Sequence, residues 1–412
     1  MKKILSLVLA LCMLLLLSSV ALAEDTINLE FWIRTAGDDY TKEIAAFEEA
    51  NPGIKVNQVQ VAGNYDELVS KYTTAIAAGN MPHLGIVGQR HGIPQIYDAG
   101  YIVPVDEWMT AEEQADILDG YWVRYTYNGV RTAVPFGSSM PVMHTNATML
   151  KELGLEVPTT FTEMLAAAAK AVKDTDGDGA TDIFGFNMAS DVPWYIQPLV
   201  WSYGGTIIDS EGNVNMTSDE MVAVLSAIAE SVKNGVMPAN QHGTGQEDFT
   251  NGTLMFYFAS CASKTSIQNA VGDKFDYQIS FLPGEKELNV CIGGNGLAVF
   301  KSDEAHEEAA AKFIKYMISN EGITSNLERG YMPFTTSQFE GEVIQQHLQD
   351  PLWKKALDQV QYIKGQNVHP ADSVIWSEIT TLLSEIEADP DMDILAALKE
   401  IQAEVDEFMM LY

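Results

Sequence analysis

Between residues 27 and 87, short apolar segments alternate with segments of helical spacing, and this alternation limits the possible folds more than any other feature. Alternating strands and helices of these lengths are typical of an open α/β sheet. The predicted strands are residues 27–33, 54–61 and 84–87, and the predicted helices between them are residues 39–50 and 64–78.

The rest of the chain is predicted to contain more helix and fewer strands. Thr160 with Glu163, and Thr217 with Glu220, form capping boxes that open two predicted helices. Asn128-Gly129 predicts a tight hairpin. A chain of 412 residues without repeats or linkers is long enough for two lobes, which we expect to be interwoven. The remaining predicted elements are helices at 194–203, 304–319, 352–363, 374–387 and from 394 to the end, strands at 254–258 and 277–282, and a hairpin at 207–216.

The first 23 residues have the pattern of an export signal. Lys2 and Lys3 precede an almost wholly apolar run, residues 4–20, and small residues follow at the positions that a signal peptidase reads. A transmembrane anchor is the alternative, but the run is slightly shorter than the ~20 apolar residues of a span and ends in a cleavage site. We therefore expect cleavage before Glu24 and an exported protein, periplasmic or extracellular and associated with the cell surface.

The three cysteines bear on lipidation and disulfide bonding. Cys12 lies in the leader after Leu11, whereas a lipobox has a small residue before its cysteine, so we do not expect a lipid anchor. Cys261 and Cys291 remain in the exported protein, where a disulfide is permitted. Both lie in short apolar runs, so the alternative of buried free thiols is at least as well supported as a bridge.

The balance of charge is strongly acidic. The chain has 57 acidic residues against 24 basic ones and a net charge of −33, which becomes −35 when Lys2 and Lys3 leave with the leader. Such a charge repels nucleic acid and anionic membrane surfaces, and it gives an anionic ligand no general attraction. We therefore expect no nucleic-acid partner, and an anionic ligand is disfavoured without being excluded.

Six segments of the exported chain occur in a recognisable order. They are residues 47–56 (FEEANPGIKV), 72–82 (YTTAIAAGNMP), 134–146 (VPFGSSMPVMHTN), 158–165 (PTTFTEML), 292–300 (IGGNGLAVF) and 330–335 (GYMPFT). In this order, behind an export signal, they resemble family 1 of the extracellular solute-binding proteins. That family includes the maltose- and glycerol-3-phosphate-binding proteins of ABC importers.

The resemblance implies an α/β, two-lobed periplasmic-binding-protein fold of type II, with lobes joined by hinge crossovers. We expect the crossovers near residues 137–141, 290–296 and 331–335, where glycines and prolines permit or fix backbone rotations. The expected N-terminal lobe is residues 24–138 plus about 296–332, and the expected C-terminal lobe is residues 139–295 plus about 333–412.

Ligand contacts are expected at the edges of the cleft between the lobes. Carried over position by position, the resemblance implies Tyr65, Gln89, Ser138 or Ser139, Ser263, Gly294, Tyr331 and Trp376. We add Trp194, which shares a helix face with Trp201, although core packing is the alternative for both rings. Asn295 is added because it lies in the glycine run 293–296, which is either a ligand-binding backbone, a hinge, or both.

The kind of ligand is inferred from two departures. The glycerol-3-phosphate branch has an acid at the position of Gln89 and an arginine at that of Trp376, whereas maltose-type relatives have a sugar-stacking tryptophan there. Flat aromatic faces suit pyranose rings, and arginine suits phosphate. We predict a neutral mono- or oligosaccharide, a monomeric protein, and delivery to an ABC permease. The alternative is a glycerol phosphate or glycerophosphodiester, with Arg90 as the phosphate partner.

An acidic loop has the spacing of a calcium site. Asp174, Asp176, Asp178 and Asp182 correspond to positions one, three, five and nine of an EF-hand-like loop, where carboxylates at alternate positions converge on a hard cation. The usual acid at position twelve is replaced by Gly185. We predict a structural Ca²⁺, with a solvated acidic turn as the alternative, and no organic cofactor.

Motifs of catalysis are missing from the sequence. There is no Gly-x-Ser-x-Gly elbow, no His-Glu-x-x-His and no phosphate-binding loop, and His91, His144 and His369 are isolated. We therefore predict a binding protein and not an enzyme. A secreted glycoside-acting enzyme and a calcium-dependent adhesion or sensor protein are the alternatives from other classes.

Overall fold

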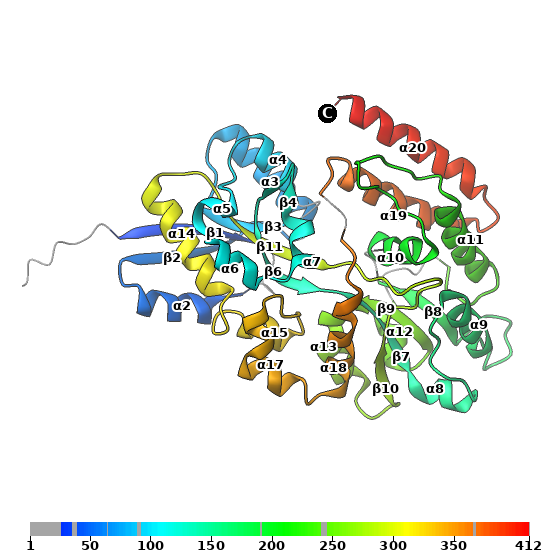
Figure 1. The fold of residues 1–412 in the computed structure, drawn as a ribbon. Coiled ribbons are helices and arrows are strands. Elements are labelled where there is room, and N and C mark those ends of the chain that lie inside the picture. The colour runs from blue at the N-terminus through cyan, green and yellow to red at the C-terminus, as the bar shows by residue number, and fades with distance from the viewer. Residues whose placement is uncertain are drawn as a thin grey trace, which may run out of the picture.

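The computed structural model describes residues 26–34, 39–63, 65–88, 92–189, 192–239, 245–365 and 368–411. The predicted leader, Gln89, Arg90 and His91 lie outside the described residues. The described residues form two α/β lobes side by side (Figure 1), which confirms the predicted fold class.

The first lobe is built on a five-stranded mixed sheet of order β2-β1-β3-β11-β6. Strand β1 pairs in parallel with β2 and β3, and β11 runs antiparallel to β3 and β6. Leu29, Phe31 and Ile33 alternate along β1 and are buried, as the period of two predicts. The strands are β1 (Ile27–Ile33), β2 (Ile54–Gln60), β3 (Leu84–Val87), β6 (Val134–Ser139) and β11 (Gly293–Val299).

Helices cover this sheet and bury its apolar residues. Phe313 of α14 packs against Phe31 and Phe47, with ring centroids 5.7 Å and 5.0 Å apart. The predicted hairpin at Asn128-Gly129 is confirmed between β4 (Thr126–Tyr127) and β5 (Val130–Arg131), and both turn residues have positive φ. The helices are α2 (Thr41–Ala50), α3 (Tyr65–Ala78), α4 (Ile93–Asp98), α5 (Val105–Trp108), α6 (Ala111–Asp116), α7 (Asp119–Trp122), η2 (Val123–Tyr125), α14 (Glu304–Met317), α15 (Thr324–Arg329), α16 (Thr336–Glu340) and α17 (Glu342–His347).

The second lobe has a four-stranded sheet of order β10-β7-β9-β8. Its strands are β7 (Pro141–Asn146), β8 (Phe184–Met188), β9 (Leu254–Ser260) and β10 (Tyr277–Ser280). Its helices are α8 (Ala147–Glu152), α9 (Phe161–Ala171), α10 (Pro193–Tyr203), α11 (Asp219–Lys233), α12 (Gly245–Asn251), η3 (Cys261–Ser263), α13 (Lys264–Val271), α18 (Pro351–Asp358), η4 (Gln359–Tyr362), α19 (Asp372–Ala388) and α20 (Ile394–Leu411).

One of the two predicted capping boxes is confirmed and the other is wrong. At α9, Thr160 accepts from the Glu163 amide and the Glu163 carboxylate accepts from the Thr160 amide. At α11 the cap is Ser218, whose side chain accepts from the Met221 amide, so the box predicted one residue earlier is wrong. The predicted hairpin at 207–216 is reduced to an isolated bridge.

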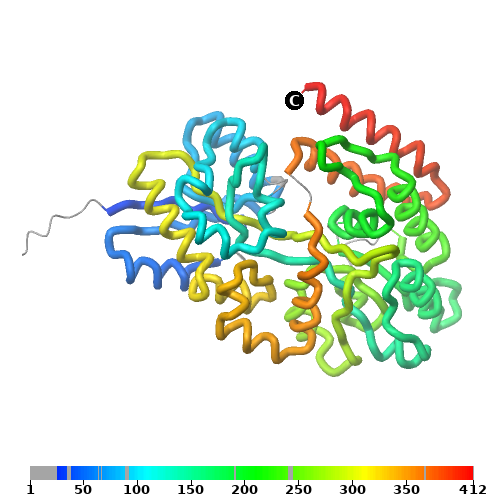
Figure 2. Tube along the Cα trace, viewed as in Figure 1, coloured from blue at the N-terminus to red at the C-terminus, as the bar shows by residue number. Residues whose placement is uncertain are grey.

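The chain passes between the lobes through strands that lie together. Strand β6 leads through Met140 into β7 of the second sheet, and β11 returns beside β6, where Gly293 pairs with Ser139. The Met332 amide donates to the Ser138 carbonyl at 2.7 Å, so residues near 332 join the same bundle. Figure 2 shows the cyan and yellow segments side by side at this passage.

Residues 335–347 make their contacts with the first lobe. Ile117 forms a bridge with Thr335, the Ser337 amide donates to Asp116, and Ile344 belongs to the apolar cluster of that lobe. The sequence prediction placed residues after about 333 in the second lobe. Asp350, just before α18, is tied to the second lobe by its ion pair with Lys264.

Two further features bear on the predictions. Cys261 and Cys291 are free and buried, in agreement with the thiol alternative. Across the described ranges, no helix has both the length and the apolar composition needed to cross a membrane.

Candidate functional site

A cavity of about 360 Å³ lies between the lobes and is lined from both of them. The first lobe supplies residues at the end of β1, the start of α3, η2, β6 and β11. The second lobe supplies residues from α10, the β9–α13 turn and α19. The lining residues are Arg34, Tyr65, Arg124, Ser139, Trp194, Tyr195, Ser260, Ala262, Ser263, Ser266, Gly293, Gly294, Tyr331 and Trp376.

The structure brings most of the predicted contact residues together in this cavity. Gln89 and Arg90 lie outside the described residues, and Ser138 and Asn295 are set back from the cavity. The predicted residues in the lining are Tyr65, Ser139, Trp194, Ser263, Gly294, Tyr331 and Trp376.

Ser138 and Asn295 support the cavity from behind. Successive side chains of a strand point to opposite faces, so Ser139 lines the cavity while Ser138 is fully buried. The Asn295 Nδ2 donates to the Tyr65 hydroxyl at 3.3 Å, and its Oδ1 accepts from the Gly137 amide at 3.2 Å. Asn295 therefore holds Tyr65 in place, which differs from the direct contact that the sequence predicted.

Two glycines allow the backbone of β11 to form part of the wall. A Cβ on Gly293 would lie 2.3 Å from the Trp194 ring, so the indole packs closely against this backbone. Gly294 has φ +94°, and a Cβ there would lie 1.6 Å from the Gly137 carbonyl oxygen. Both positions require glycine, the first for close approach and the second for its conformation as well.

Three aromatic rings belong to the second-lobe wall, beside three serines and an alanine. Trp194 and Tyr195 begin α10, and their rings lie 5.4 Å apart at an angle of 60°. Trp376 is in the first turns of α19 and is partly exposed. Trp194 and Trp201 are both buried in the apolar cluster of this lobe, which agrees with the packing alternative for Trp201, whereas Trp194 also lines the cavity. Such rings give a ligand large flat apolar faces.

Two arginines were not predicted as site residues. Arg34 follows β1, and its guanidinium lies 4.4 Å from the centroid of the Tyr65 ring. Arg124 lies on η2 and is buried. The position of Arg34 after a parallel strand is a signal that sequence reasoning could have used, because ligands bind beyond the carboxyl ends of such strands. No local pattern marks Arg124.

A buried histidine supports the serine-rich turn of the second lobe. His144 on β7 lies 3.2 Å from the Ser260 carbonyl and 2.7 Å from the Tyr277 hydroxyl. Because that carbonyl only accepts, Nε2 carries the proton and Nδ1 accepts from Tyr277. Burial lowers the pKa of His144 to about 4, so the ring is neutral at pH 7. It is a packing residue of the second lobe.

The acidic loop gathers three of its four predicted ligands. Oxygens of Asp174, Asp176 and Asp182 lie within 4.8 Å of one another. Asp178 is not part of this group, and its carboxylate accepts from the Ala180 amide. Position 185 has no room for the usual acidic side chain, because a Cβ on Gly185 would lie 2.2 Å from the Ala168 carbonyl oxygen. The calcium site stays a prediction.

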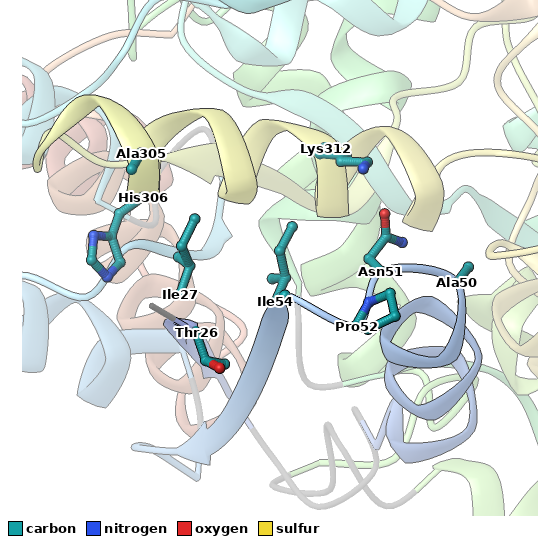
Figure 3. A pocket seen from close by; sticks show the side chains of 10 residues that line it. Thr26, Ile27, Ala50, Asn51, Pro52, Ile54, Ala305, His306 and Lys312 are labelled. Carbon is teal, nitrogen blue, oxygen red and sulfur yellow. The ribbon is translucent and has the colours of Figure 1, made fainter. Parts of the chain in front are cut away.

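A larger hollow of about 710 Å³ lies far from the cleft, between α14 and the starts of β1 and β2. In Figure 3, Ile27 and Ile54 point toward α14, with His306 and Lys312 at the rim. All of its lining residues belong to the first lobe. The hollow therefore lacks the two-sided enclosure of the cleft, which is the better candidate site.

The two α/β lobes, the adjoining passages and the aromatic cavity between them define a hinged ligand-binding protein. A family profile described as "Bacterial extracellular solute-binding protein" matches residues 42–355. The chain belongs to that family.

Relatives and solved structures agree with this assignment. A putative binding protein of Brucella abortus is 25% identical over 242 residues, which are 58% of this chain and 58% of that protein, so the chain matches little more than half of that relative. The sn-glycerol-3-phosphate-binding periplasmic protein UgpB of Salmonella typhimurium is 25% identical over 81% of this chain and 79% of its own length.

Two solved structures show the same fold. UgpB from Mycobacterium tuberculosis in complex with glycerophosphocholine has a TM-score of 0.81 at 21% identity, and covers 93% of this chain and 98% of its own. The maltose/maltodextrin-binding domain MalE of Bdellovibrio bacteriovorus, bound to maltotriose, has a TM-score of 0.78 at 19% identity, and covers 93% and 100%.

Proposed function

We propose that this protein captures a small carbohydrate or a polyol derivative outside the cytoplasm and delivers it to the permease of an ABC importer. One observation carries the proposal: a single cavity joins aromatic rings of the second lobe to hydroxyl and backbone groups of both lobes. Trp194 and Trp376 offer faces for a ring, and Ser139, Ser263 and the β11 backbone offer hydrogen-bonding groups.

The size of the cavity favours a small ligand. Its volume of about 360 Å³ is at the lower end of the roughly 300–1,000 Å³ that is usual for ligand pockets. A ligand of one or two rings, or a glycerol derivative, suits this volume better than a long oligosaccharide. The relatives support both chemistries, since one binds maltotriose and another glycerophosphocholine.

The protein acts, in this proposal, as an exported monomer without catalytic activity. Residues 1–23 serve as a cleaved leader, and the two lobes close on the ligand about the strands that join them. Family membership supports the extracellular location and the binding role.

A thermal-shift screen of the leader-free protein tests this function. A ligand that binds only the native state raises the melting temperature, so at least one sugar or polyol derivative should do so at millimolar concentration or below. Small-angle scattering with that ligand should show a smaller radius of gyration for a particle of monomer mass. A broad saccharide and polyol panel without any stabilising member contradicts the proposal, and so does turnover of a bound glycoside.

A further inference from the structure

The guanidinium of Arg124 is buried in the cleft without an acidic partner among the described residues. The residue is 9% exposed and lines the cavity. Its Nε has no hydrogen-bond partner, and no ion pair joins it to a described aspartate or glutamate. The neighbouring Tyr125 offers only a phenol: burial raises the pKa of Tyr125, against a smaller lowering by Arg124, and the hydroxyl stays neutral.

Such a side chain has to stay charged. Arginine is not deprotonated in proteins, so it cannot avoid the cost of burial by becoming neutral. Buried charges are therefore normally paired, and an unpaired one is costly for the folded chain. When an unpaired buried charge lines a ligand cavity, its partner is expected to be a group of the ligand.

In the part of the chain that the structure describes, the two hollows that Arg124 lines have no acidic residue in their walls. Among the described residues, no aspartate or glutamate lines the cleft cavity, although the chain has 57 acidic residues. Arg124 also lines a small void with Gln197, Trp201 and Lys364, and the described lining of this void contains no acid either. Lys364 has its own partner, Glu287, at 3.6 Å. Arg34 adds a second positive charge to the cavity, but the inference rests on Arg124 alone.

We propose that Arg124 binds an anionic group, a carboxylate or a phosphate, carried by a polyhydroxylated ligand. The inference rests on the proposed function and sharpens it, because it replaces the expected neutral sugar by a sugar acid or a polyol phosphate. The guanidinium offers paired N–H donors that match two oxygens of either anion. Trp194 and Trp376 then hold the rest of the ligand, and Ser139 offers a hydroxyl beside it.

Isothermal titration with matched ligand pairs tests this inference. The pairs are glucose and glucuronate, galactose and galacturonate, and glycerol and sn-glycerol 3-phosphate, with citrate as an anion that is not a carbohydrate. In at least one pair the anionic member should bind tenfold or more tightly than its neutral partner. Arg124→Gln should weaken binding of that member by about tenfold or more, because a charged hydrogen bond is lost. Binding of the neutral member should change little.

Arg131→Gln is the matched control. Arg131 belongs to the same lobe, but its guanidinium lies 4.3 Å over the Trp122 ring and donates to Gln114 Oε1 at 2.5 Å, and it does not line the cavity. This variant removes the same charge and should keep the preference for the anion. If both variants lose the same affinity for the anionic ligand, the preference comes from the overall charge of the protein, and the assignment to Arg124 is overturned.

The outcomes separate this inference from the proposed function. Neutral members that bind as tightly as their anionic partners overturn the inference and leave carbohydrate capture standing. Binding of citrate alone, lost in Arg124→Gln, supports the anion site and overturns the carbohydrate ligand. A panel without any binding overturns both.

A measurement without ligand gives an independent check. Arg124→Met keeps the apolar stem and removes the buried charge, so the ligand-free variant should melt at the temperature of the parent or above it. A fall of several degrees, with Arg131→Gln unchanged, would show that the charge has a partner within the fold and would overturn the inference.

Discussion

Replacing Gly294 by alanine should lower the stability of the folded protein by more than the left-handed backbone conformation alone would cost. Gly294 pairs with Ser138 at the point where β11 and β6 pass between the lobes. Its φ of +94° is unfavourable for any residue with a side chain, and a Cβ would lie 1.6 Å from the Gly137 carbonyl oxygen. The obstacle is backbone in a paired strand, so it cannot rotate away as a side chain could.

The expected loss of stability has three contributions. The left-handed conformation costs about 1–2 kcal/mol, and forcing an extra carbon into a packed site costs about 1–3 kcal/mol. Alanine restricts the unfolded chain and returns about 0.4–1 kcal/mol. The net loss is about 1–5 kcal/mol, with a middle value of about 3 kcal/mol, and a lobe of this size loses roughly 2–4 °C per kcal/mol. At the middle value the melting temperature should fall by about 6–12 °C.

Gly79→Ala is the control that separates strain from collision. Gly79 also has positive φ, +65°, but a Cβ there meets nothing within 4 Å. It should cost only the conformational part, about 1 kcal/mol after the gain in the unfolded state. Thermal unfolding of the parent and both variants, followed by circular dichroism, measures the difference. If Gly294→Ala melts within two degrees of Gly79→Ala, the collision argument is wrong.

Three other predictions concern the cleft ring, the acidic loop and the buried histidine. Trp376→Ala should fold normally and bind the best ligand of the panel about tenfold or more weakly, and unchanged titration calorimetry contradicts a stacking role. Chelation should lower the melting temperature of the parent by a few degrees and leave Asp176→Ala unaffected, whereas equal melting with and without calcium disposes of the site. The pKa of His144 is about 4 when folded, below its unfolded value, so the unfolded state takes up the proton first and stability falls as pH drops from 6.5 toward 4. Urea unfolding at pH 7 and pH 5 should show this loss, up to ~3 kcal/mol over the full window, in the parent and much less of it in His144→Phe.

The regular elements of the fold follow closely from local sequence. Strands β1 and β3 begin and end at the predicted residues, because their apolar positions and the flanking polar residues leave one register. The cap of α11 was displaced by one residue, since Thr217 Oγ1 donates to Asn215 Oδ1 and leaves the cap to Ser218. The place of residues 335–347 against the first lobe is set by contacts with residues more than 200 positions away, which no local pattern encodes.

The residues of the candidate site also divide into those that the sequence predicted and those that depend on the folded structure. The family resemblance supplied Tyr65 and Trp376, and the start of a helix after a strand gave Tyr65 a local signal as well. Trp194 came from the helical spacing that it shares with Trp201. Ser138 and Ser139 could be told apart only after the pairing of β6 was known, because one residue of shift exchanges the two faces. Arg124 was not predicted, because its place in the cavity wall depends on a short 3-10 turn of the first lobe that no local pattern marks.

The segments that join the two lobes also line the cavity, and this links the proposed ligand binding to the proposed closure. Ser139, Gly294 and Tyr331 line the cavity from the passages between the lobes, whereas Arg124 and Trp376 stand on opposite lobes. A rotation about β6 and β11 changes the separation of Arg124 and Trp376. The residues in the joining segments, near the axis of the rotation, move little. A ligand whose anion meets Arg124 and whose body meets Trp376 can satisfy both only at one separation. It therefore stabilises the conformation with that separation, which is the differential affinity that drives closure.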